Sequence, residues 1–300
     1  MTPPSVGELR TVDVFVGGPG GGNPVPFVAD ASRLTSQDMQ SIARTTGHES
    51  AFVLPPSTPD ADWRLRFFVP QHEMEMCGHA TVGTLWALRQ WGRWHTSSAR
   101  IETLSGLVDI EWDAVTARVW ISQPAVQAEA LTPEACRRVA TVLGLPGGQI
   151  TMLTNARTSR VKTLVPMTDI AALNALQPDF AAMEALCESI GSTGLYPYTL
   201  AAEAGEVEAR QPVVVARQFP KASGYPEDAA TGIAAAALWG QLAATAVIPA
   251  GSPQDPVVCT IRQGDAMGRP SAINVRARFG ADAATIGCWL SGEVVWSSPQ

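Results

Sequence analysis

Two short segments of small residues, each with one strongly ionisable side chain, are the first candidates for chemistry in this sequence. Cys77-Gly78-His79-Ala80-Thr81 follows a strand-like run ending in Phe-Val-Pro, and Asp228-Ala229-Ala230-Thr231-Gly232 follows one ending in Phe-Pro. Each segment leads into a strongly apolar run of helical length. The pattern predicts two turns at helix N-termini, where backbone N–H groups and the helix dipole favour a carboxylate or a developing enolate.

The small residues of these segments would let backbone amides approach a ligand closely, which larger side chains would prevent. The two segments lie about 150 residues apart, half of the chain, so duplication of a mixed strand and helix unit is the favoured interpretation. We expect both helices to begin at Ala-Thr and the two turns to grip one anion. Chance similarity of two short stretches is the alternative.

One carboxylate outside these segments is placed by a helix end. Thr35 with Asp38 resembles a capping box, and Gly47 is a suitable terminator for the helix between them. Glu49 therefore lies immediately past a predicted helix, at the start of a predicted strand over 50–54.

Other motifs of binding and catalysis lack their required context. The glycine-rich run over 17–24 has no Lys-Ser/Thr after it and ends in a proline, which predicts a wide turn and not a phosphate loop. The His, Cys and acidic residues over 48–79 fit no standard metal spacing, so no metal ligand is predicted. There is no G-x-S-x-G elbow. The five cysteines form no C-x-x-C, which indicates neither a disulfide framework nor a structural zinc site.

Composition restricts the partners. Hydrophobic residues make up 46% and charged residues 16% of the 300 residues, which predicts compact folding. The net charge of -7, without a cluster of Lys or Arg, argues against nucleic acid and anionic membranes. The alanine-rich run over 232–248 is too short and weakly apolar to span a bilayer, and no secretory signal is visible. We expect a cytoplasmic protein with a small-molecule carboxylate as its partner.

Five motifs occur in order and at consistent spacing along almost the whole chain: Gly22-Asn23-Pro24, Glu49-Ser50-Ala51-Phe52, 77–83, 227–232, and Gln263-Gly264 with 267–271. Together they resemble the phenazine-biosynthesis isomerase family, the PhzF-like proteins. The resemblance implies an α+β fold of the diaminopimelate-epimerase type, in which each of two pseudo-symmetric domains wraps a curved, mostly antiparallel sheet around a central helix. It further implies an active site between the domains, a homodimer and no cofactor.

A proline and a shift in composition near residues 123–125 mark the predicted domain boundary. The predicted domains are 1–123 and 124–300, both epimerase-like. Return of the last strands to the first domain remains open.

The resemblance also implies roles for individual residues. The carboxylate that matches Glu49 moves a proton between carbons of the substrate, and His79 and Asp228 are its expected catalytic partners. The expected substrate-binding residues are Asn23, Cys77, Gly78, Ala229, Ala230, Thr231 and Gly232. Each catalytic candidate also has a plainer interpretation. Glu49 could be a solvated surface glutamate, His79 a structural histidine and Asp228 a helix N-cap.

Two positions limit the transfer of details from the family. Epimerases with this fold use a pair of thiols, but Asp228 stands in the turn where the partner of Cys77 would lie, which disfavours a two-thiol racemase. Many members have a serine where this chain has Ile233, and phenazine enzymes commonly have an alanine in place of Cys77. We therefore expect a substrate other than the phenazine precursor.

The predicted activity is a cofactor-independent shift of a proton and a double bond in a small unsaturated carboxylic acid. A cyclic or amino-acid-derived intermediate of specialised, antibiotic-type metabolism is the expected substrate. The alternatives are an epimerase or dehydratase of a proline-like amino acid that uses Cys77, and a catalytically silent small-acid binding protein.

Overall fold

The computed structural model describes residues 5, 7–146, 152–201 and 211–297, and the chain divides into two units. Unit 1 comprises Met1–Ser122 with Leu290–Gln300, and unit 2 comprises Gln123–Trp289. The chain therefore returns to unit 1 at its end, where the last strand, β18, pairs with β1. Within each unit the strand pairs are mostly antiparallel, and each unit has its own central helix.

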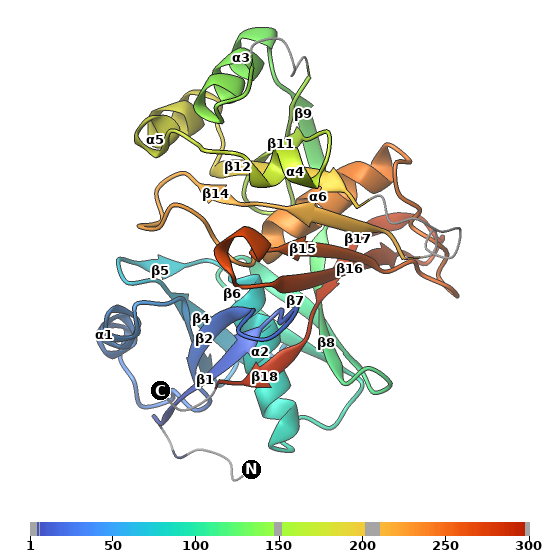
Figure 1. Ribbon diagram of the computed structural model, residues 1–300. Coiled ribbons are helices and arrows are strands. Elements are labelled where there is room, and N and C mark those ends of the chain that lie inside the picture. The colour runs from blue at the N-terminus through green and yellow to red at the C-terminus, as the bar shows by residue number, and fades with distance from the viewer. Residues whose placement is uncertain (1–4, 6, 147–151, 202–210, 298–300) are drawn as a thin grey trace. The chain divides into compact units, whose positions relative to one another are not determined.

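Unit 1 is built on strands at the two ends of the chain (Figure 1). They are β1 (Leu9–Val14), β2 (Asn23–Val28), β3 (Ser50–Leu54), β4 (Trp63–Phe68), β5 (Glu73–Met74), β6 (Ser98–Thr103), β7 (Gly106–Asp113), β8 (Arg118–Pro124) and β18 (Val294–Trp296). The pairs β2–β3 and β4–β6 are parallel. The pairs β1–β2, β3–β4, β6–β7 and β7–β8 are antiparallel.

The central helix of unit 1 is α2 (Gly78–Gln90), which contacts β1, β2, β3 and β18. Its residues are buried from Gly78 through Leu85 and again at Ala87 and Leu88. Gly83 allows the close approach to β1, because a Cβ at this position would lie 2.6 Å from Val14 Cγ2. The apolar residues of this segment point in nearly every direction around a helix, which predicted a helix packed on all sides. The burial of α2 confirms this prediction.

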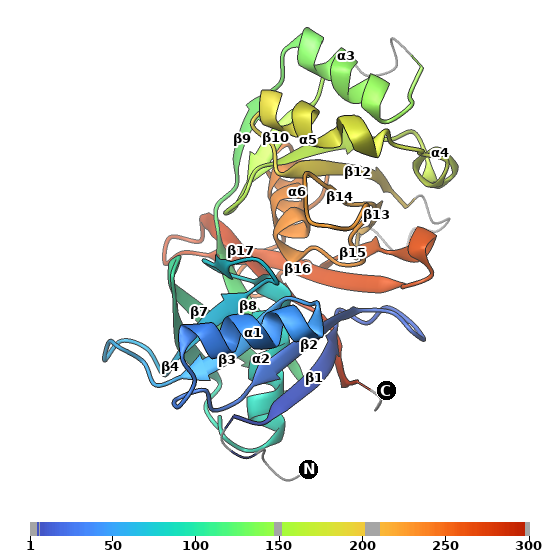
Figure 2. The same cartoon turned by 90° about the vertical axis from the view of Figure 1, so that its left-hand side faces the viewer.

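The helix α1 (Ser36–Thr46) packs on β3 and β4 (Figure 2). The predicted capping box is present: the Asp38 N–H donates to Thr35 Oγ1, and the Thr35 N–H donates to Asp38 Oδ2. Gly47 ends the helix in the left-handed region, with φ 70°. Because Met39 of this helix packs in one cluster with Phe52 of β3, the chain between α1 and β3 is held at both ends.

In its described residues, unit 2 contains the rest of the strands, four α-helices and the 3-10 helix η2 (Asp265–Met267). Its strands are β9 (Gln127–Ala130), β10 (Thr154–Arg157), β11 (Lys162–Pro166), β12 (Gly194–Leu200), β13 (Val213–Ala216), β14 (Phe219–Pro220), β15 (Cys259–Gln263), β16 (Ser271–Phe279) and β17 (Thr285–Ser291), the last of which ends in unit 1. Its α-helices are α3 (Pro133–Val142), α4 (Ile170–Asn174), α5 (Phe180–Ser189) and the central helix α6 (Gly232–Ala244). In Figure 2, α3 and α5 lie side by side.

The strand directions repeat between the units. In unit 1, β2–β3 is parallel, β3–β4 antiparallel, β4–β6 parallel and β6–β7 antiparallel. In unit 2, β11–β12 is parallel, β12–β13 antiparallel, β13–β15 parallel and β15–β16 antiparallel. The central helix follows a two-residue strand in both units, β5 before α2 and β14 before α6. The repeat confirms the predicted pseudo-symmetric α+β plan.

The predicted start of the central helices at Ala-Thr was wrong in both units. The helix α2 begins at Gly78, two residues before Ala80, whereas α6 begins at Gly232, two residues after Ala230. In both units the first helical residue is a buried glycine, and the N-cap residue before it makes no side-chain cap hydrogen bond. No helix within the described ranges has both the length and the apolar character needed to cross a membrane.

Candidate active site

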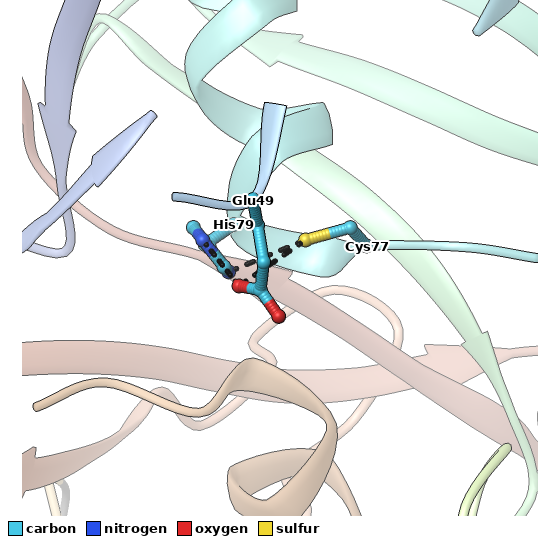
Figure 3. Close-up of side chains that lie close together, drawn as sticks. All are labelled: Glu49, Cys77 and His79. Carbon is cyan, nitrogen blue, oxygen red and sulfur yellow. Dashed lines mark hydrogen bonds and ion pairs between the residues drawn. The ribbon is translucent and has the colours of Figure 1, made fainter. Parts of the chain in front are cut away.

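Three predicted site residues, Glu49, Cys77 and His79, meet at the start of α2 in unit 1 (Figure 3). His79 Nε2 lies 3.0 Å from Glu49 Oε2. Cys77 Sγ lies 3.9 Å from the same carboxylate oxygen and 3.4 Å from His79 Nδ1. The imidazole thus contacts the carboxylate through one nitrogen and the thiol through the other.

Glu49 is fixed by the turn between α1 and β3. The left-handed Gly47 reverses the chain, and its N–H donates to the carbonyl of Ala43. The buried Ser50 hydroxyl donates to the carbonyl of His48 and shares a hydrogen bond with Thr46 Oγ1, both at 3.1 Å. These contacts set the direction in which Glu49 leaves the backbone.

The other two residues belong to α2 itself. Cys77 is the N-cap residue, and His79 lies in the first turn. The Thr81 hydroxyl and N–H both donate to the carbonyl of Cys77, at 2.8 and 3.0 Å, which holds this turn. Cys77 and His79 are buried, while the Glu49 side chain keeps 25% of its exposure. The carboxylate is therefore the member of the cluster that solvent or a ligand reaches most readily.

Burial and neighbouring charge set the protonation states of the cluster. Burial raises the pKa of the Cys77 thiol above its ordinary value. Burial on its own would lower the pKa of His79, but Cys77 and the Glu49 carboxylate outweigh it and hold this pKa well above its ordinary value. The protonated imidazole of His79 is thereby favoured next to the carboxylate of Glu49.

This geometry is suited to proton transfer. A carboxylate next to a cationic partner can accept a proton from a carbon acid and return it to a second carbon. The imidazolium offsets the negative charge beside the developing anion. The same Glu49, Cys77 and His79 are also a set of three potential metal ligands whose donor atoms lie within 4.8 Å of one another.

The second acidic candidate, Asp228, lies in a hydrogen-bond network before α6 in unit 2. The Thr231 hydroxyl donates to Asp228 Oδ2 at 2.5 Å. Gln263 Nε2 donates to the Asp228 carbonyl at 2.7 Å and to Thr231 Oγ1 at 3.2 Å, and the Tyr196 hydroxyl donates to Gln263 Oε1 at 2.9 Å. Gln263 and Tyr196 are fully buried, so the network fixes Asp228 from the protein interior.

Gln263 and Tyr196 were not predicted as site residues. Gln263-Gly264 is one of the five family motifs, and this signal could have pointed to Gln263. Gly264 has φ +82°, and a Cβ on it would lie 2.8 Å from the Ala229 carbonyl oxygen. The glycine therefore lets the Gln263 segment pack directly on the turn that carries Asp228. Tyr196 had no comparable signal in the sequence.

The structure places the other predicted binding residues at or near the helix starts. Gly78 and Gly232 are the first residues of α2 and α6, and Ala229 and Ala230 are buried in the turn before α6. Asn23 begins β2, where it pairs with Val14 of β1. Their contacts with a substrate stay predictions.

The family model of phenazine biosynthesis-like proteins, PhzC-PhzF, matches residues 12–297. The chain belongs to this family. A relative from Deinococcus radiodurans, named an uncharacterized isomerase, is 33% identical over 276 residues, which cover 88% of this chain and 84% of the relative. The trans-2,3-dihydro-3-hydroxyanthranilate isomerase of Pseudomonas aeruginosa is 33% identical over 272 residues, which cover 89% of this chain and 88% of that enzyme.

A solved structure supports the same conclusion. The phenazine biosynthesis protein of the PhzF family from Bacillus anthracis matches with a TM-score of 0.81 at 25% identity, covering 97% of this chain and 98% of that one. The resemblance seen in the sequence motifs and the fold that it implied are thereby confirmed. With relatives named isomerases over most of its length, the chain is a PhzF-like isomerase.

Proposed function

We propose that this PhzF-like isomerase moves a proton, and with it a double bond, within a small unsaturated carboxylic acid, without a cofactor. The observation that carries the proposal is the 3.0 Å pair between Glu49 Oε2 and His79 Nε2 at the start of a buried helix. This pair joins a partly exposed carboxylate to a buried cation, the combination that a reversible proton carrier needs.

In the proposed reaction Glu49 removes a proton from a carbon that is acidified by the unsaturated system. The electron pair moves into the conjugated system, and the protonated Glu49 then delivers the proton to another carbon of the same system. The His79 imidazolium balances the charge of the carboxylate before and after the transfer. Amides near Gly78, Ala229 and Gly232 would hold the anionic part of the substrate.

A cyclic or amino-acid-derived acid of specialised, antibiotic-type metabolism is the proposed substrate. The name of the Pseudomonas aeruginosa relative, whose substrate is trans-2,3-dihydro-3-hydroxyanthranilate, supports this class. Ile233 and Cys77 give this chain a more apolar neighbour and a different polar group at its helix starts, so we propose a related substrate and not that compound itself. A cytoplasmic homodimer is the proposed working form.

The test is transfer of solvent deuterium into carbon positions of candidate acids in D₂O, followed by NMR. The panel contains trans-2,3-dihydro-3-hydroxyanthranilate, other cyclic unsaturated amino acids, and proline and hydroxyproline. For an acid that exchanges, Glu49→Gln is expected to lower the rate by about 10²–10⁴-fold, the usual contribution of general acid–base catalysis. The matched control is Glu75→Gln, which changes an exposed carboxylate two residues before Cys77. Unchanged exchange in Glu49→Gln would remove Glu49 from the mechanism.

The contact between Cys77 Sγ and His79 Nδ1 favours a second candidate, epimerisation or dehydration of a proline-like amino acid with Cys77 as one base. The same experiment separates the two activities. Inversion of configuration with deuterium uptake, lost in Cys77→Ala, would identify an epimerase. A shifted double bond with near-normal rate in Cys77→Ala would identify the isomerase. Binding of an acid without any exchange would identify a silent binding protein.

A further inference from the structure

We propose that Glu49, Cys77 and His79 also form a binding site for one thiophilic divalent cation of the zinc type, and that the bound ion stops proton transfer. The binding part of the proposal stands on the geometry of the three side chains alone. The inhibitory part rests on the function proposed for Glu49.

The donor atoms are of the kinds that zinc prefers. A thiolate, an imidazole nitrogen and a carboxylate oxygen bind Zn²⁺ at roughly 2.0–2.3 Å, which places the ligand atoms of a tetrahedral ion about 3.3–3.7 Å from one another. The Cys77 Sγ to His79 Nδ1 distance is 3.4 Å, and the Cys77 Sγ to Glu49 Oε2 distance is 3.9 Å. The Glu49 carboxylate, which lies beside Nε2, would turn toward the thiol to complete the three-ligand face, with Nδ1 as the histidine ligand.

Two of the three ligands are held rigidly, and the third is accessible to solvent. Cys77 and His79 are buried and held by the first turn of α2, so their donor atoms are preorganised. The Glu49 side chain is 25% exposed, so solvent reaches the carboxylate and can supply water as a fourth ligand. Three protein ligands with one open position are typical of exchangeable zinc sites.

Charge also favours a divalent ion at this place. On binding, the Cys77 thiol and the His79 imidazolium each release a proton to solvent, the latter from Nδ1. The thiolate and the carboxylate then neutralise the two positive charges of the ion. Sulfur and nitrogen donors select Zn²⁺ or Co²⁺ over Mg²⁺ and Ca²⁺, which prefer oxygen ligands. The buried His79 Nε2 is 3.0 Å from Glu49 Oε2 but has no well-aligned hydrogen bond.

The sequence predicted no metal site because the spacing of neighbouring residues was the only guide. His48, His72 and Glu73 crowd the same stretch, but none belongs to the cluster. The fold instead adds Glu49, 28 residues before Cys77, to the Cys-x-His pair. Within the described part of the chain, this is the one group of three or more His, Cys, Asp or Glu side chains close enough to share an ion.

The experiment is a titration of the metal-free, reduced full-length chain with Co²⁺, which reports thiolate ligation as a near-ultraviolet charge-transfer band. We expect saturation at one equivalent and loss of the band when Zn²⁺ displaces Co²⁺. Cys77→Ala should abolish the band. The matched control is Cys288→Ala, which removes an equally buried thiol outside the cluster. Glu49→Gln should keep the band but weaken binding at least tenfold.

Absence of the band in the natural sequence, or its persistence in Cys77→Ala, would overturn the proposed site. The inhibitory part is tested separately by deuterium exchange: saturating Zn²⁺ should lower the rate at least tenfold, and a chelator should restore it. Unchanged exchange at saturation would overturn the inhibition. Loss of exchange on chelation would instead contradict the cofactor-independent function, while the metal site would stand.

Discussion

The starts of the two central helices share one backbone plan and differ in the chemistry placed on it. Both α2 and α6 have 13 residues and begin with glycine, after the N-cap residues Cys77 and Thr231. In this register Cys77 corresponds to Thr231, and His79 corresponds to Ile233. The two repeats are therefore aligned on the first residues of α2 and α6, and not on the two Ala-Thr pairs.

Each N-cap side chain contacts a carboxylate and makes no cap hydrogen bond to its own helix. Cys77 Sγ lies 3.9 Å from Glu49 Oε2, and Thr231 Oγ1 lies 2.5 Å from Asp228 Oδ2. In unit 1 a titratable imidazole completes the group, whereas in unit 2 the amide of Gln263 does so. The start of α2 therefore carries groups that can change their protonation, whereas the start of α6 carries hydroxyl and amide groups that keep one hydrogen-bond arrangement.

The buried tyrosine of unit 2 agrees with this division. Burial, together with the negative charge of Asp228, raises the pKa of Tyr196 well above its ordinary value. Its hydroxyl therefore stays protonated and keeps donating to Gln263 across the pH range of most enzymes. A network of hydroxyl and amide groups of this kind is rigid because every member has a fixed donor or acceptor role.

A matching arginine–glutamate pair stands before each helix. Arg66 of β4 contacts both carboxylate oxygens of Glu73 at 2.6 and 2.7 Å, and Arg217 contacts both of Glu227 at 2.9 and 2.8 Å. Each guanidinium also lies over the ring two residues further along, Phe68 in unit 1 and Phe219 in unit 2. Bidentate pairs of this type tie the strand to the segment that leads into the helix.

The largest expected effect distinguishes these two pairs. Glu227 is 10% exposed and Glu73 is 25% exposed. In Glu227→Gln the more deeply buried guanidinium therefore loses its carboxylate and keeps backbone carbonyls as uncharged acceptors. We expect a loss of about 3 kcal/mol in the free energy of unfolding for Glu227→Gln and about 1 kcal/mol for Glu73→Gln. Urea denaturation followed by circular dichroism measures both. Equal losses would show that the two pairs are interchangeable.

A smaller effect is expected at the N-cap residues. Thr231→Val removes the hydroxyl that donates to Asp228 and keeps the shape of the side chain, which should cost about 2 kcal/mol, as for hydrogen bonds to charged groups. Cys77→Ala removes only a long contact and a packed sulfur, for which we expect about 1 kcal/mol. Thr231→Ser, which retains the hydroxyl, is the control. A larger loss in Cys77→Ala would reverse the comparison.

The smallest effect is a pH dependence confined to unit 1. The pKa of His79 is raised in the folded chain, so its stabilising contribution is complete below about pH 6.5 and is lost as the pH rises through the higher folded value. The unfolding free energy should therefore fall with rising pH, by at most about 1.4 kcal/mol per pH unit, more steeply than in His79→Gln. The exposed His95→Gln is the control. Parallel pH profiles for the natural chain and His79→Gln would contradict the assignment.

Local signals in the sequence predicted some elements well and missed others. The capping box of α1 and the apolar character of α2 are local features, and both were predicted. The strand β2 was missed because Pro24 and Pro26 fall inside it. In β2, the residues that pair with β3 are Phe27 and Val28. The two prolines lie outside this pairing, so their missing N–H groups cost no hydrogen bond to β3. Strands β10, β11 and β12 were also not predicted.

The sequence by itself determined the identity of the family and the repeated plan, and it indicated Glu49, Cys77 and His79 as site candidates, because motifs, caps and apolar periodicity are short-range. The tertiary structure decided that these residues meet. Ser50 pairs with Phe68, and Phe68 pairs with Glu73, which brings Glu49 next to the turn that carries Cys77 and His79. Such strand pairing depends on burial shared by the whole unit, and no local pattern records it.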